Sequence, residues 1–167
     1  FLNKKEKLSD LVIQKNENII KNLSEQIIKL GGKVNLGNEN QKDLIKDLNK
    51  HLEQLSIKNI LSDKSKNIIK DETINNIKVR FQKITDLQPK DLRKLVDNGK
   101  KEIGEGIVII FASKDEKIGL AVGVTNKLTN KYDAVKFAKT GSEIIGGKGG
   151  GGRSDFAQAG GNEIKKI

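Results

Sequence analysis

Hydrophobic residues recur at two different spacings along the chain, and the change divides it into two regions. Over residues 8–30 and 41–55, isoleucine, leucine and valine return at steps of three and four, which is the spacing of amphipathic helices. Gly31 and Gly32 end the first segment, where a helix cap is expected. The pattern predicts a helical arm over residues 1–70, whose helices pair as an antiparallel hairpin or expose an apolar stripe to another subunit.

From residue 77 onwards the spacing is that of strands and shorter helices. Apolar and polar residues alternate over 77–82, which predicts a half-buried strand with a basic outer face. Residues 57–71 fit either a short helix or a connecting strand. The fold class is therefore α/β, with a small mixed sheet over residues 71–167 behind the helical arm. Apolar runs and helix signals predict the remaining elements, which are strands at 107–111 and 118–124 and helices beginning at Pro89 and covering 131–145.

The composition argues against several kinds of site. The chain has no cysteine and one histidine, His51, so we expect no disulfide, no thiolate nucleophile and no zinc site. No Asp-x-Asp array marks a magnesium site, and no run of about eighteen apolar residues suits a membrane helix. We expect no catalytic residue, metal or cofactor in this segment, no membrane contact and a cytoplasmic location. The absence of methionine indicates a piece of a longer protein.

The chain is basic, with 32 lysine and arginine residues against 22 acidic ones and a net charge of +10. Such an excess favours a polyanionic partner, because cations that neutralise phosphates supply most of the sequence-independent affinity for nucleic acid. The excess is spread evenly, however, and richness in lysine, asparagine and isoleucine is also typical of an AT-rich genome. Arginine occurs only at Arg80, Arg93 and Arg153. Its use at Arg153 suggests two-pronged donation to phosphate or base edges.

Glycine is concentrated near the C-terminus. Residues 146–161, GGKGGGGRSDFAQAGG, hold eight of the chain's 17 glycines. Glycine allows consecutive N–H groups to turn towards one ligand, so this run with Lys148 and Arg153 predicts a phosphate cradle. A flexible linker is the alternative, but the partly apolar residues 155–159 favour a folded turn and a short strand. Dinucleotide and P-loop folds are not supported, because a helix precedes the glycines and Ser142 stands where the P-loop needs glycine.

The glycine-rich run closely resembles the signature that closes the C-terminal domain of the alanyl-tRNA synthetases, GGKGGGRP followed by two residues and AQAGG. That domain belongs to the wider DHH-associated family. The run has one glycine more than the commonest signature, and Ser154 replaces proline. The resemblance covers residues 72–161, because three upstream stretches are similar to the same domain in the same order: LQPKDLRKLVDNGKKEIGEGIVIIFAS, GLAVGVTNKLT and GSEIIGG.

The resemblance implies a role in a bacterial-type alanine–tRNA ligase. In that family other domains activate alanine with ATP, charge tRNA and remove mischarged amino acids at a zinc site. ATP, magnesium and zinc are therefore expected in the parent protein, and no cofactor in this segment. The C-terminal domain holds the tRNA elbow, links the two active sites and, in some members, forms homo-oligomers. The implied partners are tRNA(Ala) and the aminoacylation and editing domains of the same chain.

The resemblance also assigns roles within the glycine-rich run. Lys148 and Arg153 are expected to meet the tRNA sugar–phosphate backbone, and Gln158 to exchange a hydrogen bond from the loop. Close approach of RNA is expected at Gly146, Gly147, Gly149, Gly150, Gly151 and Gly152. In one alternative these glycines only pack the loop against the sheet. Two others are the phosphate-binding domain of a DHH phosphodiesterase, where a histidine usually follows the glycines, and an oligomerisation arm formed by residues 8–55.

Overall fold

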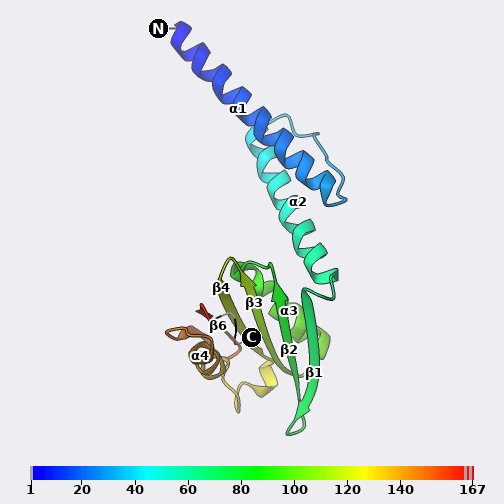
Figure 1. Cartoon of the computed structure of the whole chain (residues 1–167), viewed down its shortest axis with the longest axis vertical. Helices are drawn as coiled ribbons and strands as arrows, with labels where there is room; N and C mark the ends of the chain where they lie inside the picture. Colours follow the sequence, from blue (N-terminus) through cyan, green and yellow to red (C-terminus); the bar gives the residue numbers. More distant parts are fainter. Residues whose placement is uncertain (1, 164, 166) are drawn as a thin grey trace. The chain divides into compact units, whose positions relative to one another are not determined.

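The computed structural model describes residues 2–163, 165 and 167. It divides into two compact units, residues 1–59 and 60–167 (Figure 1). The first is helical and the second combines a mixed sheet with helices, which confirms the predicted α/β class. The predicted boundary between residues 70 and 71 stays a prediction, and it lies within strand β1. Among the described residues, no helix has both the length and the apolar content that crossing a membrane requires.

Both predicted helices of the first unit are confirmed, and each is longer than its apolar pattern. They are α1 (Leu2–Lys29) and α2 (Gln41–Ser62). Gly31 adopts a φ of +79° just after α1, as a glycine cap does. Asn40 begins α2, because its side-chain oxygen accepts the N–H of Lys42 at 3.0 Å. Local signals therefore place both helix ends close to where the sequence predicts them.

The predicted antiparallel hairpin is wrong, because α1 and α2 run parallel (Figure 1). Asn16 Nδ2 donates to Gln41 Oε1 at 3.1 Å near the start of α2. Asn59 Nδ2 donates to the carbonyl oxygen of Leu30 at 3.3 Å near the other end. The connection over 31–40 permits this direction, since ten extended residues span about 33 Å and fifteen helical residues rise only about 22 Å. The buried contact consists of Leu23, Ile27, Leu44 and Leu48.

The second unit is built on one mixed sheet, in which the described residues form strands in the order β1-β2-β3-β4-β6-β5. β2 and β3 are parallel, and the other neighbouring pairs are antiparallel. The predicted strands at 77–82, 107–111 and 118–124 are confirmed, the last two as a hairpin. The ambiguous stretch 57–71 contains both the end of α2 and the start of β1. The strands are β1 (Asn67–Ile74), β2 (Ile77–Thr85), β3 (Gly106–Lys114), β4 (Lys117–Val124), β5 (Gly150–Arg153) and β6 (Phe156–Gly161).

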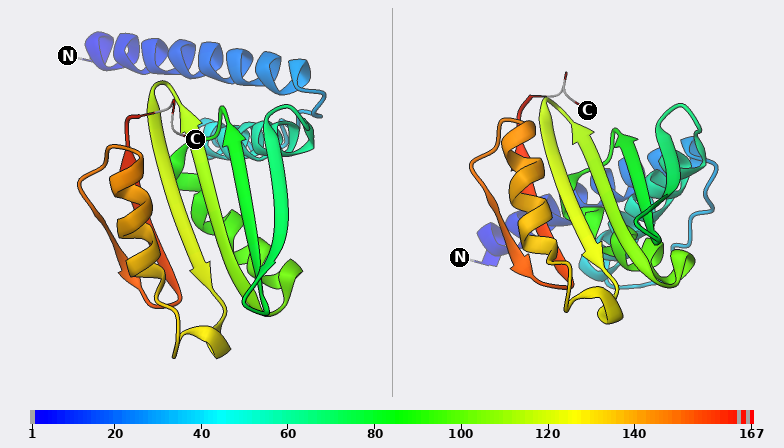
Figure 2. Two further views of the ribbon diagram at one scale, coloured as in Figure 1. Left: turned by 60° about the horizontal axis from the view of Figure 1, so that its bottom comes forward. Right: turned by 90° about the horizontal axis from the view of Figure 1, so that it is seen from below.

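Two helices pack on opposite faces of the sheet. They are α3 (Leu92–Ile103), which follows a single 3-10 turn at Pro89–Asp91, and α4 (Ala134–Ile144). Along β4, a Cβ added at Gly123 would overlap Val96 of α3, whereas Leu120 lies against Gly141 of α4. Positions 120 and 123 point to opposite faces, because side chains alternate along a strand. Figure 2 shows α4 beside the β5–β6 hairpin at one side of the sheet.

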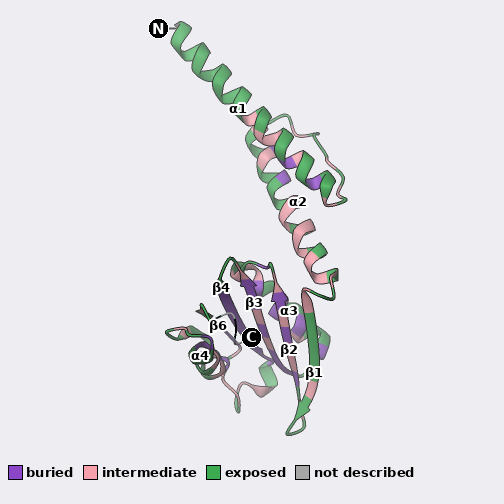
Figure 3. Ribbon diagram, viewed as in Figure 1, coloured by how far each residue is buried: buried purple, intermediate pink, exposed green. Residues whose placement is uncertain are grey.

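Burial is greatest in the central strands β3 and β4, whereas β1 is largely exposed (Figure 3). Gly99 lies within α3 and faces β3. It is buried, and a Cβ there would come within 3.0 Å of a Val108 methyl group of β3. Glycine at this position lets the helix approach the sheet closely, and this packing offsets its poor helix propensity.

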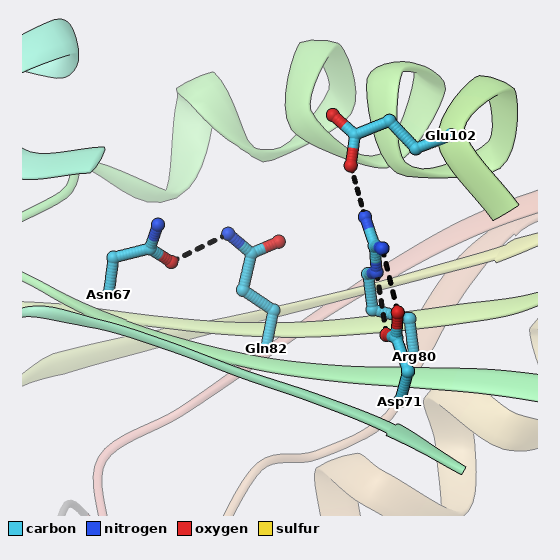
Figure 4. A network of polar contacts seen from close by, with 5 residues as sticks. All are labelled: Asn67, Asp71, Arg80, Gln82 and Glu102. Carbon is cyan, nitrogen blue, oxygen red and sulfur yellow. Dashed lines mark hydrogen bonds and ion pairs between the residues drawn. The ribbon is translucent and has the colours of Figure 1, made fainter. Parts of the chain in front are cut away.

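The predicted basic outer face of β2 is wrong at Arg80 and Gln82, because α3 packs over this part of the face and β1 pairs with β2 beside it (Figure 4). Lys78 on the same face is exposed. Gln82 is 8% exposed, and its Nε2 donates to Asn67 Oδ1 at 2.7 Å. The Arg80 guanidinium donates to both carboxylate oxygens of Asp71 at 2.8 Å and also contacts Glu102 of α3. Hydrogen bonding to Asp71 raises the pKa of Arg80, and hydrogen bonding to Arg80 lowers the pKa of Asp71. Arg80 therefore holds β1, β2 and α3 together.

Candidate nucleic-acid interface

The glycine-rich run is a turn followed by a β-hairpin. Residues 145–149 form the turn after α4, and the next four residues are strand β5, which lies at the edge of the sheet. After Ser154 and Asp155 the chain returns as β6, which confirms the short strand predicted at the end of the run. The expected loop therefore contains an edge strand, because pairing with β6 supplies the order that glycine lacks on its own.

Ser142 of α4 organises the turn, a role that the sequence did not indicate. Its side chain is fully buried, and its hydroxyl accepts the Gly149 N–H at 3.1 Å. The hydroxyl oxygen also lies 3.3 Å from the Gly149 carbonyl and 3.4 Å from the Gly160 carbonyl, either of which it can donate to. The Gly147 N–H donates to the Ser142 carbonyl at 2.7 Å. Two N–H groups of the expected phosphate cradle are thus already used within the protein.

Close packing explains several of the glycines. A Cβ at Gly147 would overlap the Gly160 carbonyl oxygen, and one at Gly152 would overlap the Phe156 carbonyl oxygen. Gly146 and Gly149 adopt φ values of +71° and +117°, which only glycine adopts easily. These features favour the alternative in which glycine packs the turn against the sheet. Gly151 differs, because no atom lies within 4 Å of the position a Cβ would take.

The two expected cations flank β5 and do not converge. Lys148 lies in the turn two residues before β5, and Arg153 is the last residue of the strand. Both side chains are exposed. Gln158 is half-buried in β6, opposite Gly151 in the register of the hairpin. The arrangement suits contacts to separate phosphates better than one shared cradle.

Helix α3 adds two cations at the Arg153 end of the hairpin. Lys100 Nζ donates to the Asp155 backbone carbonyl at 3.3 Å and lies 4.0 Å from Asp155 Oδ2. Arg153 Nε lies 3.5 Å from Asp155 Oδ1. The Arg93 guanidinium carbon lies 4.7 Å from the centre of the Phe156 ring. We call Arg93, Lys100, Arg153 and Asp155 the turn cluster; the only hint in the sequence was the rarity of arginine.

Lys100 also lines an open groove of about 800 Å³. It lies beside the C-terminal end of α3, and its rim carries three lysines and two carboxylates. Lys127 is paired with Glu105 at 3.3 Å across this rim. In the described part of the chain, no three His, Asp or Glu side chains gather as a metal site needs. The groove is lined by Asp97, Lys100, Lys101, Gly104, Glu105, Thr125, Asn126 and Lys127.

The mixed sheet, the α4 turn and the glycine-rich hairpin define a known class of domain. Residues 76–167 match the model of the DHHA1 domain, and the chain belongs to this family. Its curated relatives include the alanine–tRNA ligase of Parvibaculum lavamentivorans, which is 47% identical over 97 residues, and that of Bradyrhizobium diazoefficiens, which is 44% identical over 95 residues. The matches cover 58% and 56% of this chain but 11% of each relative.

A solved structure supports the same relationship. The C-Ala domain of Aquifex aeolicus alanyl-tRNA synthetase superposes with a TM-score of 0.55 and 28% sequence identity. The match covers 59% of this chain and 87% of that one. The resemblance inferred from the glycine-rich run is therefore confirmed at both levels. The matched region spans about a ninth of the length of each of these curated relatives.

Proposed function

We propose that this chain is the C-terminal tRNA-binding region of an alanine–tRNA ligase, which holds the elbow of tRNA(Ala) and links the aminoacylation and editing domains. The observation that carries the proposal is the 47% identity to an alanine–tRNA ligase across the matched region. The likeness to a C-Ala domain and the net charge of +10 add support. This segment contributes binding, while ATP, magnesium and zinc serve other domains of a cytoplasmic parent enzyme.

Contacts to the RNA backbone suit the geometry of the hairpin. Lys148 and Arg153 reach different phosphates along one strand of RNA, because they flank β5. Gly151 allows the backbone to approach the RNA between them, since it has free space around its α-carbon. The half-buried Gln158 is placed to bond from the same hairpin. Such contacts recognise the shape of a folded RNA and not its base sequence.

Fluorescence anisotropy of full-length tRNA(Ala) and of an acceptor-stem minihelix tests the proposal at two salt concentrations. The minihelix keeps the phosphates and lacks the elbow. We expect tighter binding of the full tRNA, with a preference that persists at the higher salt. Lys148→Ala and Arg153→Ala should each weaken binding and flatten its salt dependence. Equal, salt-sensitive binding of both RNAs would reduce the role to general electrostatics and refute elbow recognition.

Oligomerisation through α1 is a second candidate function, because the N-terminal part of this helix exposes an apolar stripe. Leu8, Leu11 and Val12 are 66%, 62% and 47% exposed, at spacings that place them on one side of the helix. The stripe leads into Ile19, which packs on the contact between α1 and α2. Sedimentation velocity should show self-association that Leu8→Ser with Leu11→Ser abolishes. A monomer at all concentrations would reject this candidate.

A further inference from the structure

The charges of the turn cluster are unbalanced in a way that points to an anionic ligand. One carboxylate, Asp155, lies between two cations, with Arg153 Nε 3.5 Å from one oxygen and Lys100 Nζ 4.0 Å from the other. Both distances exceed those of a strong charge-assisted hydrogen bond, which are near 2.8 Å. The carboxylate is thus close to both cations without satisfying either. Arg153 is 73% exposed, so its remaining donors face solvent.

The hairpin turn itself is firmly held, so the cluster is ordered before any ligand arrives. The Val124 N–H donates to the Asp155 carbonyl at 3.0 Å, and the Ala134 N–H donates to the Ser154 carbonyl at 3.0 Å. Lys100 has only 17% of its side chain exposed, and its hydrogen bond to the Asp155 carbonyl keeps its charge at the turn. A preorganised cation costs less ordering entropy on binding than a free surface lysine.

Arg93 extends the positive charge along α3. Its guanidinium lies over the Phe156 ring, a geometry that leaves the edge of the planar group free to donate to phosphate oxygens. Arg93 and Lys100 are seven positions apart, so they lie two turns apart on the same side of the helix. The cluster therefore spans the hairpin and the helix.

We infer that Arg93, Lys100 and Arg153 form one phosphate-binding cluster and that Asp155 is an internal counter-ion, which an RNA phosphate replaces on binding. The inference rests on the proposed function, since it names further residues of the RNA-binding surface. In the free domain Asp155 offsets the repulsion among the cations. In the complex it repels the phosphate and lowers the affinity. Asp155 thereby limits binding to RNAs that also engage Lys148, at the far end of β5.

Replacing Asp155 tests this inference, because we expect the RNA affinity to rise when its charge is removed. Asp155→Asn keeps the shape and the backbone hydrogen bonds and removes the negative charge. It should bind both tRNA(Ala) and a twelve-nucleotide poly(U) about two- to fivefold more tightly, the range that an exposed ion pair covers. The slope of log affinity against log salt should steepen by about 0.7, because one more cation is free to neutralise phosphate.

Asp115→Asn is the matched control. It removes the same charge from the exposed β3–β4 turn, at the opposite end of β4 from Val124 and hence from the cluster. The separation of roughly 24 Å is more than twice the Debye length of about 10 Å at 0.1 M salt. Asparagine also tolerates the φ of +49° found at this position. Its affinity for both RNAs should equal that of the parent.

The outcomes separate the inference from the proposed function. Unchanged or weaker RNA binding by Asp155→Asn would overturn the inference and leave Asp155 with a structural role only. Lys100→Gln is a second test, and it does not require that Asp155→Asn folds. It should weaken binding to both RNAs about two- to fivefold, and parent-like affinity would overturn the inference. A parent chain that binds poly(U) as tightly as tRNA(Ala) would instead refute the proposed function, whatever Asp155→Asn does.

Discussion

Removing the Ser142 hydroxyl tests whether the α4–β5 turn is held by this single side chain. Ser142→Ala deletes the acceptor of the Gly149 N–H, at 3.1 Å, and the donor to the carbonyl of Gly149 or Gly160. The hydroxyl is fully buried, whereas Gly149 is exposed, so water can restore part of the lost bonding. A buried group left unpaired costs about 1–3 kcal/mol. We therefore expect the free energy of unfolding to fall by about 1–2 kcal/mol.

Tyrosine fluorescence during urea unfolding reports on the second unit, residues 60–167, which contains Ser142. The chain has no tryptophan and one tyrosine, and Tyr132 lies next to α4 with its ring 6.3 Å from that of Phe137. Ser154→Ala is the matched control, because it removes a hydroxyl from an exposed position in the same hairpin and should change stability by less than about 0.5 kcal/mol. Equal midpoints and slopes for Ser142→Ala and the parent would refute the assigned role of Ser142.

Three further predictions concern two glycines and the helix direction. Gly147→Ala should destabilise the second unit by several times the roughly 1 kcal/mol of an ordinary substitution, because its methyl group would overlap the Gly160 carbonyl. Gly151→Ala should leave the urea midpoint unchanged and weaken tRNA binding; unchanged binding would mean that RNA does not approach the backbone there. Spin labels at positions 16 and 41 should be closer together than labels at positions 16 and 59, because positions 41 and 59 lie roughly 27 Å apart along α2. Pulsed electron paramagnetic resonance measures both distances. A shorter distance between positions 16 and 59 would support the antiparallel hairpin instead.

Several features of the candidate site were visible before the structure. The glycine-rich run, its two cations and its family resemblance are all contiguous in sequence, so they need no tertiary information. The roles of Ser142, Lys100 and Arg93 were not visible. Ser142 reaches residues seven and eighteen positions later, and Lys100 reaches a residue fifty-five positions later. No local pattern encodes such contacts, because they arise only when α3, α4 and the hairpin pack on one sheet.

The sequence by itself determined most of the helices and the central strands, since hydrophobic spacing, glycine caps and an N-terminal asparagine act within a few residues. It left β1 ambiguous and did not show that β5 is a strand. It also determined the family, through a motif that closes the domain. Only the tertiary structure decided the direction of α2, because a ten-residue connection is long enough for either orientation and the apolar stripes pack both ways. It likewise decided that Arg80 faces α3: alternation separates the two faces of a strand but does not say what covers each.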